Sequence, residues 1–260
     1  YRLLREQALV LARRLLSLRL ERGGRLAIVA ETNPDFLRFF FACQYAGLVP
    51  VALPASVNLG GHDAYVTRLR GLLQGCGASA AMASNHFLRF LREAAESADL
   101  AFIGTPAAFD ELPERETELR SSGPAETAYL QYTSGSTSFP RGVVITQHAV
   151  LSNLIGVVNY GLDIQADDRC VSWLPFYHDM GLVLGICAPI LSGQRAELTS
   201  PVSFLERPAR WVRSLAENPH AWSSAPNFAF DLAARKTTDS DLVGLDLGEV
   251  LGIISGAERV

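Results

Sequence analysis

The chain has 260 residues, of which 48% are hydrophobic and 19% charged, so it carries enough apolar material for a large buried core in one or two lobes. A net charge of −4 and scattered arginines argue against nucleic acid as a partner. Cys43, Cys76, Cys170 and Cys187 form no C-x-x-C pair and have no histidine at ligand spacing, which predicts reduced, mostly buried thiols. The longest apolar run, about 180–191, is too short to cross a bilayer and the N-terminus does not resemble a signal peptide, so we expect a cytoplasmic protein without a transmembrane segment.

The first hundred residues alternate between helix and strand patterns. Apolar residues recur at helical spacing from Leu4 to Leu18, and two glycines end that helix before an apolar strand at 26–30. Asn33-Pro34-Asp35 has the pattern of an N-cap, a first-turn proline and an acid that complements the helix dipole, which predicts a helix over 36–46. Further strands are predicted at 49–53, 78–83 and 100–103, and further helices at 63–73 and 85–98. This alternation indicates a parallel sheet covered by helices.

Residues 104–125 differ in kind. Three prolines interrupt a segment with five acidic side chains and few large apolar ones, so we interpret it as a solvated connector between lobes at about 1–103 and 126–260. The alternation then resumes, with strands predicted at 127–132, 143–146, 170–174, 196–198, 221–223 and 250–255. Helices are predicted at 149–160, 181–191, 204–217 and 227–234. The predicted fold class is therefore α/β, with two lobes of mostly parallel β-sheet flanked by helices.

A loop rich in glycine and hydroxyl side chains lies between the predicted strands 127–132 and 143–146. Its sequence over 133–142 is Thr-Ser-Gly-Ser-Thr-Ser-Phe-Pro-Arg-Gly. Glycine lets backbone N–H groups approach phosphate oxygens, hydroxyl groups donate hydrogen bonds, and arginine adds a fixed positive charge. The loop is not a P-loop, because G-x-x-x-x-G-K-[ST] is absent. The candidate residues of this triphosphate site are Thr133, Ser134, Gly135, Ser136, Thr137 and Arg141.

Two more polar segments follow predicted strands. Residues 173–181, Trp-Leu-Pro-Phe-Tyr-His-Asp-Met-Gly, place His178 and Asp179 just past strand 170–174. Ligands of open parallel sheets gather outside the carboxyl ends of strands, so chemistry is plausible there. The segment Ser-Gly-Ala-Glu at 255–258 follows another strand in the same way. Taken alone, a single histidine and a short turn more often serve structure than chemistry.

Together these segments resemble the adenylate-forming superfamily of acyl and aminoacyl ligases. Residues 133–142 are similar to its phosphate-loop signature, and residues 175–181 to its P-x-[FY]-H-x-x-G element. Residues 256–258 are similar to its G-A-E-P stretch, with Arg259 in place of the usual proline. Residues 53–73, 177–181 and 224–236 are similar to stretches typical of fatty acyl-AMP ligases. The resemblance covers nearly the whole chain in the family's order.

This resemblance implies that a fatty acid is activated with ATP and Mg²⁺ to a fatty acyl-adenylate and pyrophosphate. The acyl group would pass to an acyl carrier protein or a polyketide synthase in lipid or polyketide synthesis. The loop 133–141 would bind the β- and γ-phosphates, and His178 would lie beside the carboxylate and the α-phosphate. Gly256, Ala257 and Glu258 would line the adenine site.

The resemblance also bears on the acyl group and on the extent of the chain. Gly181, Gly185 and Ala188 fall near one face of a predicted helix, where either another helix or a slender acyl chain would approach. The predicted substrate pocket comprises Gly181, Asn227 and Phe228, although a phenylalanine in a helix more often fills core. The family's Mg²⁺ ligand and mobile C-terminal lid domain would lie beyond residue 260. We therefore expect an incomplete large N-terminal domain with little activity alone.

Three alternatives stay open from the sequence. A fatty acyl-CoA ligase would make the same intermediate and transfer the acyl group to CoA. An amino-acid-activating domain would place an aspartate for the substrate ammonium in this segment, and Asp179 is adjacent to His178. A non-catalytic nucleotide-binding module would keep the loop without the rest of the machinery.

Overall fold

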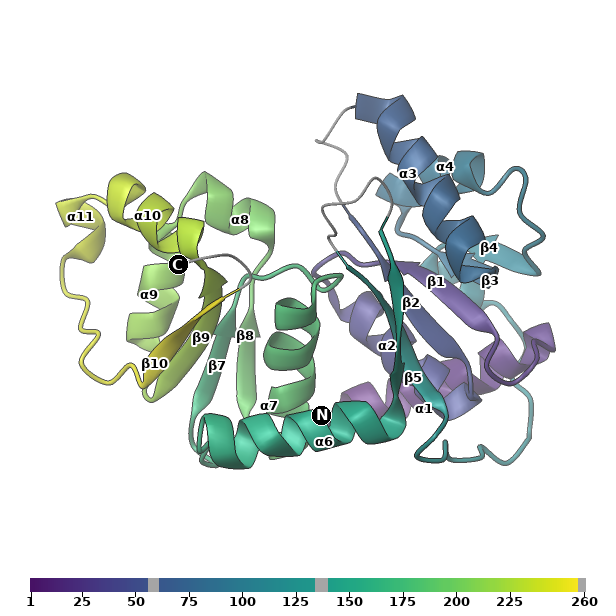
Figure 1. Ribbon diagram of the computed structural model, residues 1–260, viewed down its shortest axis with the longest axis horizontal. Helices are drawn as coiled ribbons and strands as arrows, with labels where there is room; N and C mark the ends of the chain where they lie inside the picture. The colour runs from purple at the N-terminus through teal and green to yellow at the C-terminus, as the bar shows by residue number, and fades with distance from the viewer. Residues whose placement is uncertain (56–60, 134–139, 257–260) are drawn as a thin grey trace. The chain divides into compact units, whose positions relative to one another are not determined.

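The computed structural model describes residues 1–55, 61–133 and 140–256 and divides the chain into two compact units (Figure 1). The first unit is Tyr1–Leu151 and the second is Ser152–Val260. The predicted class is confirmed: each unit is a mostly parallel sheet flanked by helices. The predicted lobe boundary at 104–125 differs from this division. Strand β5 (Thr127–Tyr132) pairs with β2 (Val49–Leu53), so residues after the connector complete the first sheet.

In the described part of the first unit, six strands lie in the order β4-β3-β1-β2-β5-β6, and only β5 and β6 pair antiparallel. Its remaining strands are β1 (Arg25–Val29), β3 (Ala78–Met82), β4 (Phe102–Gly104) and β6 (Gly142–Thr146). Its helices are α1 (Arg2–Leu15), α2 (Pro34–Ala46), α3 (Gly61–Cys76), α4 (Asn85–Ala94) and α5 (Pro106–Asp110), and the division of the chain falls within α6 (Gln147–Gly156).

The central strands β1 and β2 of the first sheet are buried on both faces, which explains their continuous apolar runs. Val49, Val51 and Leu53 of β2 pack into one cluster with apolar residues of α3 and α4. Leu26 and Ile28 of β1 point to the opposite face and are fully buried, since successive side chains of a strand alternate between faces. Helices α1 and α2 pack against each other, and α2 against β1 and β2.

The predicted start and end of α2 are confirmed. The Asn33 side chain accepts a hydrogen bond from the Phe36 N–H at 3.0 Å, so it caps the helix as the sequence indicates. Gly47 ends the helix with φ of 70°, a left-handed conformation that glycine adopts without steric cost. This cap fixes the tight return of the chain into β2.

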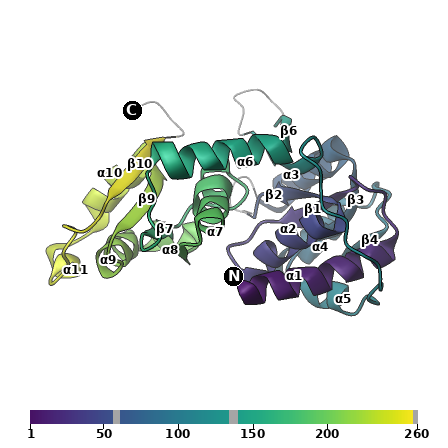
Figure 2. The same cartoon turned by 90° about the horizontal axis from the view of Figure 1, so that it is seen from below.

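The connector 104–125 is not wholly solvated. Its first part forms α5, which lies beside α1 (Figure 2). Phe109 of α5 is fully buried, with its ring edge against Phe39 at 5.1 Å between centroids. Asp110 accepts hydrogen bonds from Arg14 at 2.9 Å and from Arg38 at 2.8 Å. The acidic composition suggested solvent because the arginine partners of this carboxylate lie far away in the sequence.

Up to residue 256, the second unit has four parallel strands in the order β10-β9-β7-β8. The strands are β7 (Arg169–Ser172), β8 (Arg195–Leu198), β9 (Ala221–Pro226) and β10 (Gly252–Gly256). The helices after α6 are α7 (Ala188–Ser192), α8 (Pro201–Glu206), α9 (Ala209–Glu217), α10 (Asn227–Lys236) and α11 (Asp239–Leu242). Two π-helical segments, Val157–Gly161 and Met180–Cys187, continue α6 and precede α7.

Alternation along β7 shows how this second sheet is covered. Val171 packs with Phe204 of α8 and Trp211 of α9 in one cluster. Ser172 lies on the opposite face, where the Met180–Cys187 segment approaches it. The helix predicted at 204–217 is two helices, since Pro208 lacks the N–H that a continuous helix requires.

The expectation for the cysteines is confirmed. The cysteines are free and buried, and burial raises the pKa of the Cys170 and Cys187 thiols to about 12, so these thiols are not reactive nucleophiles. None of the described helices combines the length and apolar content that a membrane span requires.

Candidate functional site

The carboxyl edge of the second sheet gathers most of the sequence-predicted residues of that unit (Figure 1). From β7 the chain crosses to β8 on one side, and from β9 it crosses to β10 on the other. The ends of β7 and β9 therefore flank a topological switch point, where open α/β sheets bind ligands. The segment with His178 follows β7, and Asn227 follows β9 directly. Gly256 ends β10 in register with Pro226 of β9.

The His178 segment is a tight turn fixed by its own backbone. The His178 N–H donates to the Pro175 carbonyl at 3.1 Å, and the Leu182 N–H donates to the His178 carbonyl at 2.8 Å. A Cβ added at Gly181 would overlap the Pro175 carbonyl oxygen and lie 3.1 Å from that of Leu174. Only glycine fits there, which gives the P-x-Y-H-x-x-G spacing of residues 175–181 a steric reason.

Gly181 and Gly185 pack against a strand and its loop, whereas the sequence suggested a second helix or an acyl chain. At Gly185 an added Cβ would lie 3.0 Å from the Ser172 hydroxyl oxygen, so this glycine faces β7. Gly181 faces the loop that follows β7. The described packing thus brings a strand and its loop, rather than a second helix, against this face. An acyl chain near Gly181 stays a prediction.

His178 and Asp179 form a close pair at the start of the Met180–Cys187 segment. Nδ1 of His178 lies 2.7 Å from Oδ1 of Asp179, and the Met180 N–H donates to the same oxygen at 2.8 Å. The hydrogen bond from His178 is the main cause that holds the pKa of Asp179 below its usual value, so this carboxylate is ionised at neutral pH. The imidazole is 33% exposed and accessible to a ligand.

Aromatic side chains flank this edge of the sheet. Trp173, directly after β7, stacks on Phe204 with ring centroids 3.9 Å apart. Phe228 of α10 meets the same indole edge-on at 6.2 Å and remains 47% exposed. Phe230 instead packs against Trp211 at 5.9 Å. Phe230 therefore contributes to the core, whereas Phe228 offers an apolar surface beside the candidate site.

Gly256 lies close to the His178 segment. A Cβ added at Gly256 would stand 3.7 Å from the Met180 side chain. The structure thus brings together two segments that the sequence separates by about 75 residues. The other two predicted adenine contacts, Ala257 and Glu258, lie outside the described residues.

The predicted phosphate loop belongs to the first unit and connects β5 to β6. The strands on its two sides are confirmed as an antiparallel hairpin in which Tyr132 pairs with Gly142. The Thr133 N–H donates to the Arg141 carbonyl at 3.0 Å and closes the base of the loop, and the Arg141 side chain is exposed. Ser134, Gly135, Ser136 and Thr137 lie outside the described residues.

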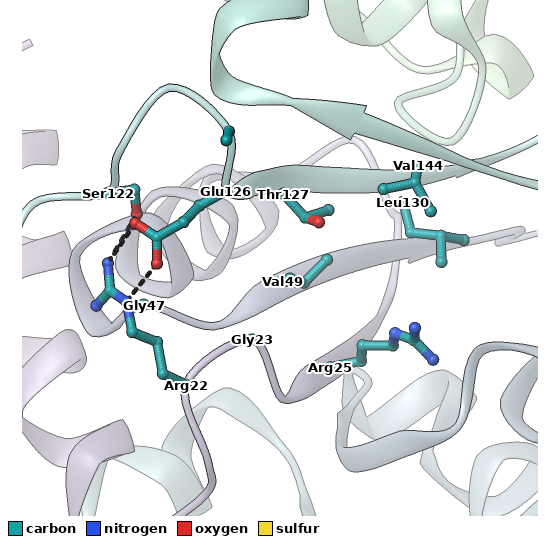
Figure 3. A pocket seen from close by; sticks show the side chains of 11 residues that line it. Arg22, Gly23, Arg25, Gly47, Val49, Ser122, Glu126, Thr127, Leu130 and Val144 are labelled. Carbon is teal, nitrogen blue, oxygen red and sulfur yellow. Dashed lines mark hydrogen bonds and ion pairs between the residues drawn. The ribbon is translucent and has the colours of Figure 1, made fainter.

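A pocket of about 290 Å³ opens near the amino ends of β1, β2 and β5 (Figure 3). Arg22 and Glu126 form an ion pair at one part of its wall, and Arg25, Leu130 and Val144 line another. None of these residues was predicted from the sequence, because Arg22 and Glu126 are separated by 104 positions. Asp167, Asp168 and His220 also cluster, with ligand atoms within 4.8 Å of one another, beside the amino ends of β7 and β9.

Comparison with known proteins shows which family this chain resembles. The model of the AMP-binding enzyme family matches residues 1–260. The chain is 44% identical over 246 residues to the putative fatty-acid–CoA ligase FadD21 of Mycobacterium tuberculosis, covering 92% of this chain and 42% of that protein. It is 42% identical over 253 residues to the long-chain-fatty-acid–AMP ligase FadD26 of Mycobacterium marinum, covering 92% of this chain and 41% of that protein.

A solved structure from a study of fatty acyl-adenylate ligases of Escherichia coli and Legionella pneumophila matches with a TM-score of 0.95 and 40% identity. It covers 100% of this chain and 47% of that chain. The chain therefore spans less than half the length of each of these three relatives. On the match of the family model along its whole length, the chain belongs to the family of AMP-binding enzymes.

Proposed function

We propose that the protein activates a fatty acid with ATP to a fatty acyl-adenylate and pyrophosphate, in the cytoplasm, and passes the acyl group to an acyl carrier protein. The observation that carries this proposal is the arrangement of the His178 turn, Asn227 and Gly256 at one carboxyl edge of a parallel sheet. The similarity to fatty-acid–AMP and fatty-acid–CoA ligases supports the substrate class.

The chemistry asks for charge stabilisation and positioning, not for a general base. A fatty carboxylate has a pKa of roughly 4 to 5, by analogy with Glu, so it is already ionised at neutral pH. Its attack on the α-phosphate brings two anions together and releases negative charge onto pyrophosphate, which fixed dipoles and cations stabilise. We assign the β- and γ-phosphates to Thr133, Ser134, Gly135, Ser136 and Thr137, with Arg141 as the neighbouring cation.

His178 is the group that we assign to the attacking carboxylate. Its imidazole is partly exposed at the switch point, and the backbone of its turn is held by the Pro175 and Leu182 hydrogen bonds. A side chain on so constrained a turn loses little conformational freedom when it meets a ligand. Gly256, Ala257 and Glu258 are proposed to line the adenine, and Gly181, Asn227 and Phe228 the acyl group.

The described residues at this edge provide few ligands for magnesium. Of the described residues that immediately follow β7, β8 and β9, only Asp179 carries a carboxylate, and that carboxylate already bonds His178 and the Met180 N–H. Octahedral Mg²⁺ is usually held by one or two carboxylates together with phosphate oxygens and water. We therefore propose Mg²⁺ as a partner of ATP and assign no ligand to it in this part of the chain.

The apolar surface beside the candidate site favours a fatty acid over an amino acid. The neighbouring Trp173 and the half-exposed Phe228 present apolar surface, which suits an alkyl chain.

CoA as the acceptor is the second candidate, because one of the similar proteins is named a fatty-acid–CoA ligase.

ATP–pyrophosphate exchange in the full-length protein tests the first step. Lauric acid should support exchange and a panel of amino acids should not. The double variant Thr133→Ala with Ser134→Ala should reduce the exchange rate by orders of magnitude, roughly 10²-fold or more, because a phosphate-binding loop acts on the transition state. The matched control, Thr117→Ala with Ser121→Ala, removes the same groups from the exposed connector and should leave exchange unchanged.

Near-normal exchange in the Thr133 and Ser134 variant would remove this loop from the mechanism. The acceptor is tested separately, by offering the preformed laurate intermediate to holo acyl carrier protein or to free CoA. Transfer to the carrier's phosphopantetheine thiol supports the proposal. Transfer to CoA alone would favour the second candidate.

A further inference from the structure

We propose that Asp179 is a positioning residue: its carboxylate fixes the ring of His178 and holds the proton on Nδ1, so that Nε2 is the nitrogen presented to the ligand. The inference deepens the proposed function, on which it rests for the identity of the ligand. The contact itself is a property of the described structure and can be tested without any substrate.

The geometry of the pair carries the inference. Nδ1 of His178 lies 2.7 Å from Asp179 Oδ1, a short distance typical of a charge-assisted hydrogen bond. The Met180 N–H lies 3.4 Å from Nδ1 but 2.8 Å from Asp179 Oδ1, so it donates to the carboxylate. Nδ1 is therefore the donor of the pair, because the carboxylate can only accept.

The other ring nitrogen is left for a ligand. Among the residues that the structure describes, Nε2 of His178 has no hydrogen-bond partner. When Nδ1 carries the proton of a neutral imidazole, Nε2 is an acceptor, and a change of partner at Nδ1 changes the role of Nε2. Protonation of the ring makes Nε2 a donor while the Asp179 contact is retained.

The support of Asp179 is itself rigid. Its carboxylate accepts a hydrogen bond from the Met180 N–H at the start of the Met180–Cys187 segment. That segment packs closely against Pro175, because Gly181 has no side chain. The imidazole, the carboxylate and the turn thus form one connected unit. A group that hydrogen-bonds to a ligand-binding side chain commonly fixes the orientation of that side chain.

A histidine-tautomer measurement tests the contact directly. The chain has five histidines, so ¹⁵N-histidine labelling with a His178→Gln sample assigns the resonances of His178 in long-range ¹H–¹⁵N spectra at pH 8. We expect the Nδ1–H tautomer in the wild type and loss of that preference in Asp179→Ala. Asp179→Asn should rescue it, since the amide oxygen accepts from Nδ1. The control Asp239→Ala removes another exposed acid near a helix start and should change nothing.

An unchanged tautomer in Asp179→Ala would overturn the proposal. Failure of the enzymatic proposal gives a different pattern: no exchange with any fatty acid in the wild type, with the tautomer result intact. The two outcomes are therefore distinguishable.

A double-mutant cycle on laurate-dependent exchange connects the contact to catalysis. Asp179→Ala should lower the exchange rate roughly tenfold, within the range of coupling energies for contacting residues, and leave the KM for ATP unchanged. In a His178→Ala background the same change should have no further effect, because Asp179 then has nothing to position. Fully additive losses would mean that Asp179 acts on the substrate by itself and would contradict the inference.

Discussion

Two charged pairs, one in each unit, differ in how many of their hydrogen-bonding atoms are engaged within the protein. Arg22 donates hydrogen bonds to both carboxylate oxygens of Glu126, at 2.5 and 3.0 Å (Figure 3). It also donates to the Ser121 carbonyl at 3.2 Å. In the His178–Asp179 pair, one ring nitrogen is engaged and the other has no partner among the described residues. The first pair joins the residue before β5 to the turn before β1. The second stands at the carboxyl edge of a parallel sheet.

The difference teaches how to separate structural from functional charge in this fold. A pair whose donors and acceptors are mostly engaged within the protein stabilises the fold. The hydrogen bonds from Arg14 and Arg38 to Asp110 of α5 are of the same kind. A pair that fixes one partner and leaves its second polar atom accessible is equipped to bind something else. The pocket beside Arg22 and the edge beside His178 therefore call for different experiments.

The packing of Phe109 in α5 gives the prediction of greatest magnitude, a loss of unfolding free energy. Phe109→Ala removes a fully buried ring from between Phe39 and Phe102 and should lower the free energy of unfolding by about 3–5 kcal/mol. Urea denaturation followed by circular dichroism measures it. The control Phe228→Ala, at a half-exposed ring, should cost far less. Equal losses would mean that α5 is not packed as described.

Gly181→Ala should have an intermediate effect. The new methyl group would overlap the Pro175 carbonyl, so the His178 turn must shift, at a cost of about 1–3 kcal/mol in unfolding free energy. Laurate-dependent exchange should fall as well, because the imidazole moves with its turn. Gly252→Ala is the matched control, since nothing described lies within 4 Å of the added Cβ. If both variants are equally stable and active, the steric account of Gly181 is wrong.

Glu126→Gln should have the smallest effect, and a pH dependence of known sign. The Arg22 hydrogen bond, aided by the Gly123 N–H, lowers the pKa of Glu126 to about 2 from an ordinary 4.5. A carboxylate with a lowered pKa in the folded state stabilises above its ordinary pKa, and this stabilisation is lost as pH falls toward the folded value. The stability difference between wild type and variant should thus be constant from pH 7 to about 5.5 and shrink between pH 4.5 and 2.

Urea denaturation at several pH values measures that difference, with Glu116→Gln in the exposed connector as the control. A difference that stays the same at pH 2.5 would show that the Arg22 contact does not hold the carboxylate ionised. It would also weaken the contrast between the two charged pairs.

Local signals in the sequence were sufficient for most elements of the fold. The Asn33 cap and the Gly47 end of α2 depend on neighbours within four residues, and the hydroxyl loop was correctly placed between two strands. Long-range pairing was not visible. Nothing near Phe109 or Asp110 indicates the arginines and rings that bury α5, and nothing in strand 127–132 shows that it joins β2.

The candidate site was predictable in part for the same reason. His178 and Asn227 follow strands and Gly256 ends one. Because the carboxyl ends of parallel strands share an edge of the sheet, their common location could be expected. The role of Gly181 as a close-approach residue, and the bond between neighbouring His178 and Asp179, depend on the geometry of one turn. Composition and spacing carry no information about that geometry.

The most direct test of the account is a crystal structure of the full-length protein with a non-hydrolysable lauroyl-adenylate analogue. We predict the adenine beside Gly256 and the acyl carbonyl or its phosphate-like linkage within hydrogen-bond distance of His178 Nε2, with Asp179 still bonded to Nδ1. An analogue bound in the pocket lined by Arg25 and Val144, with His178 contacting only solvent, would contradict the assignment of the site.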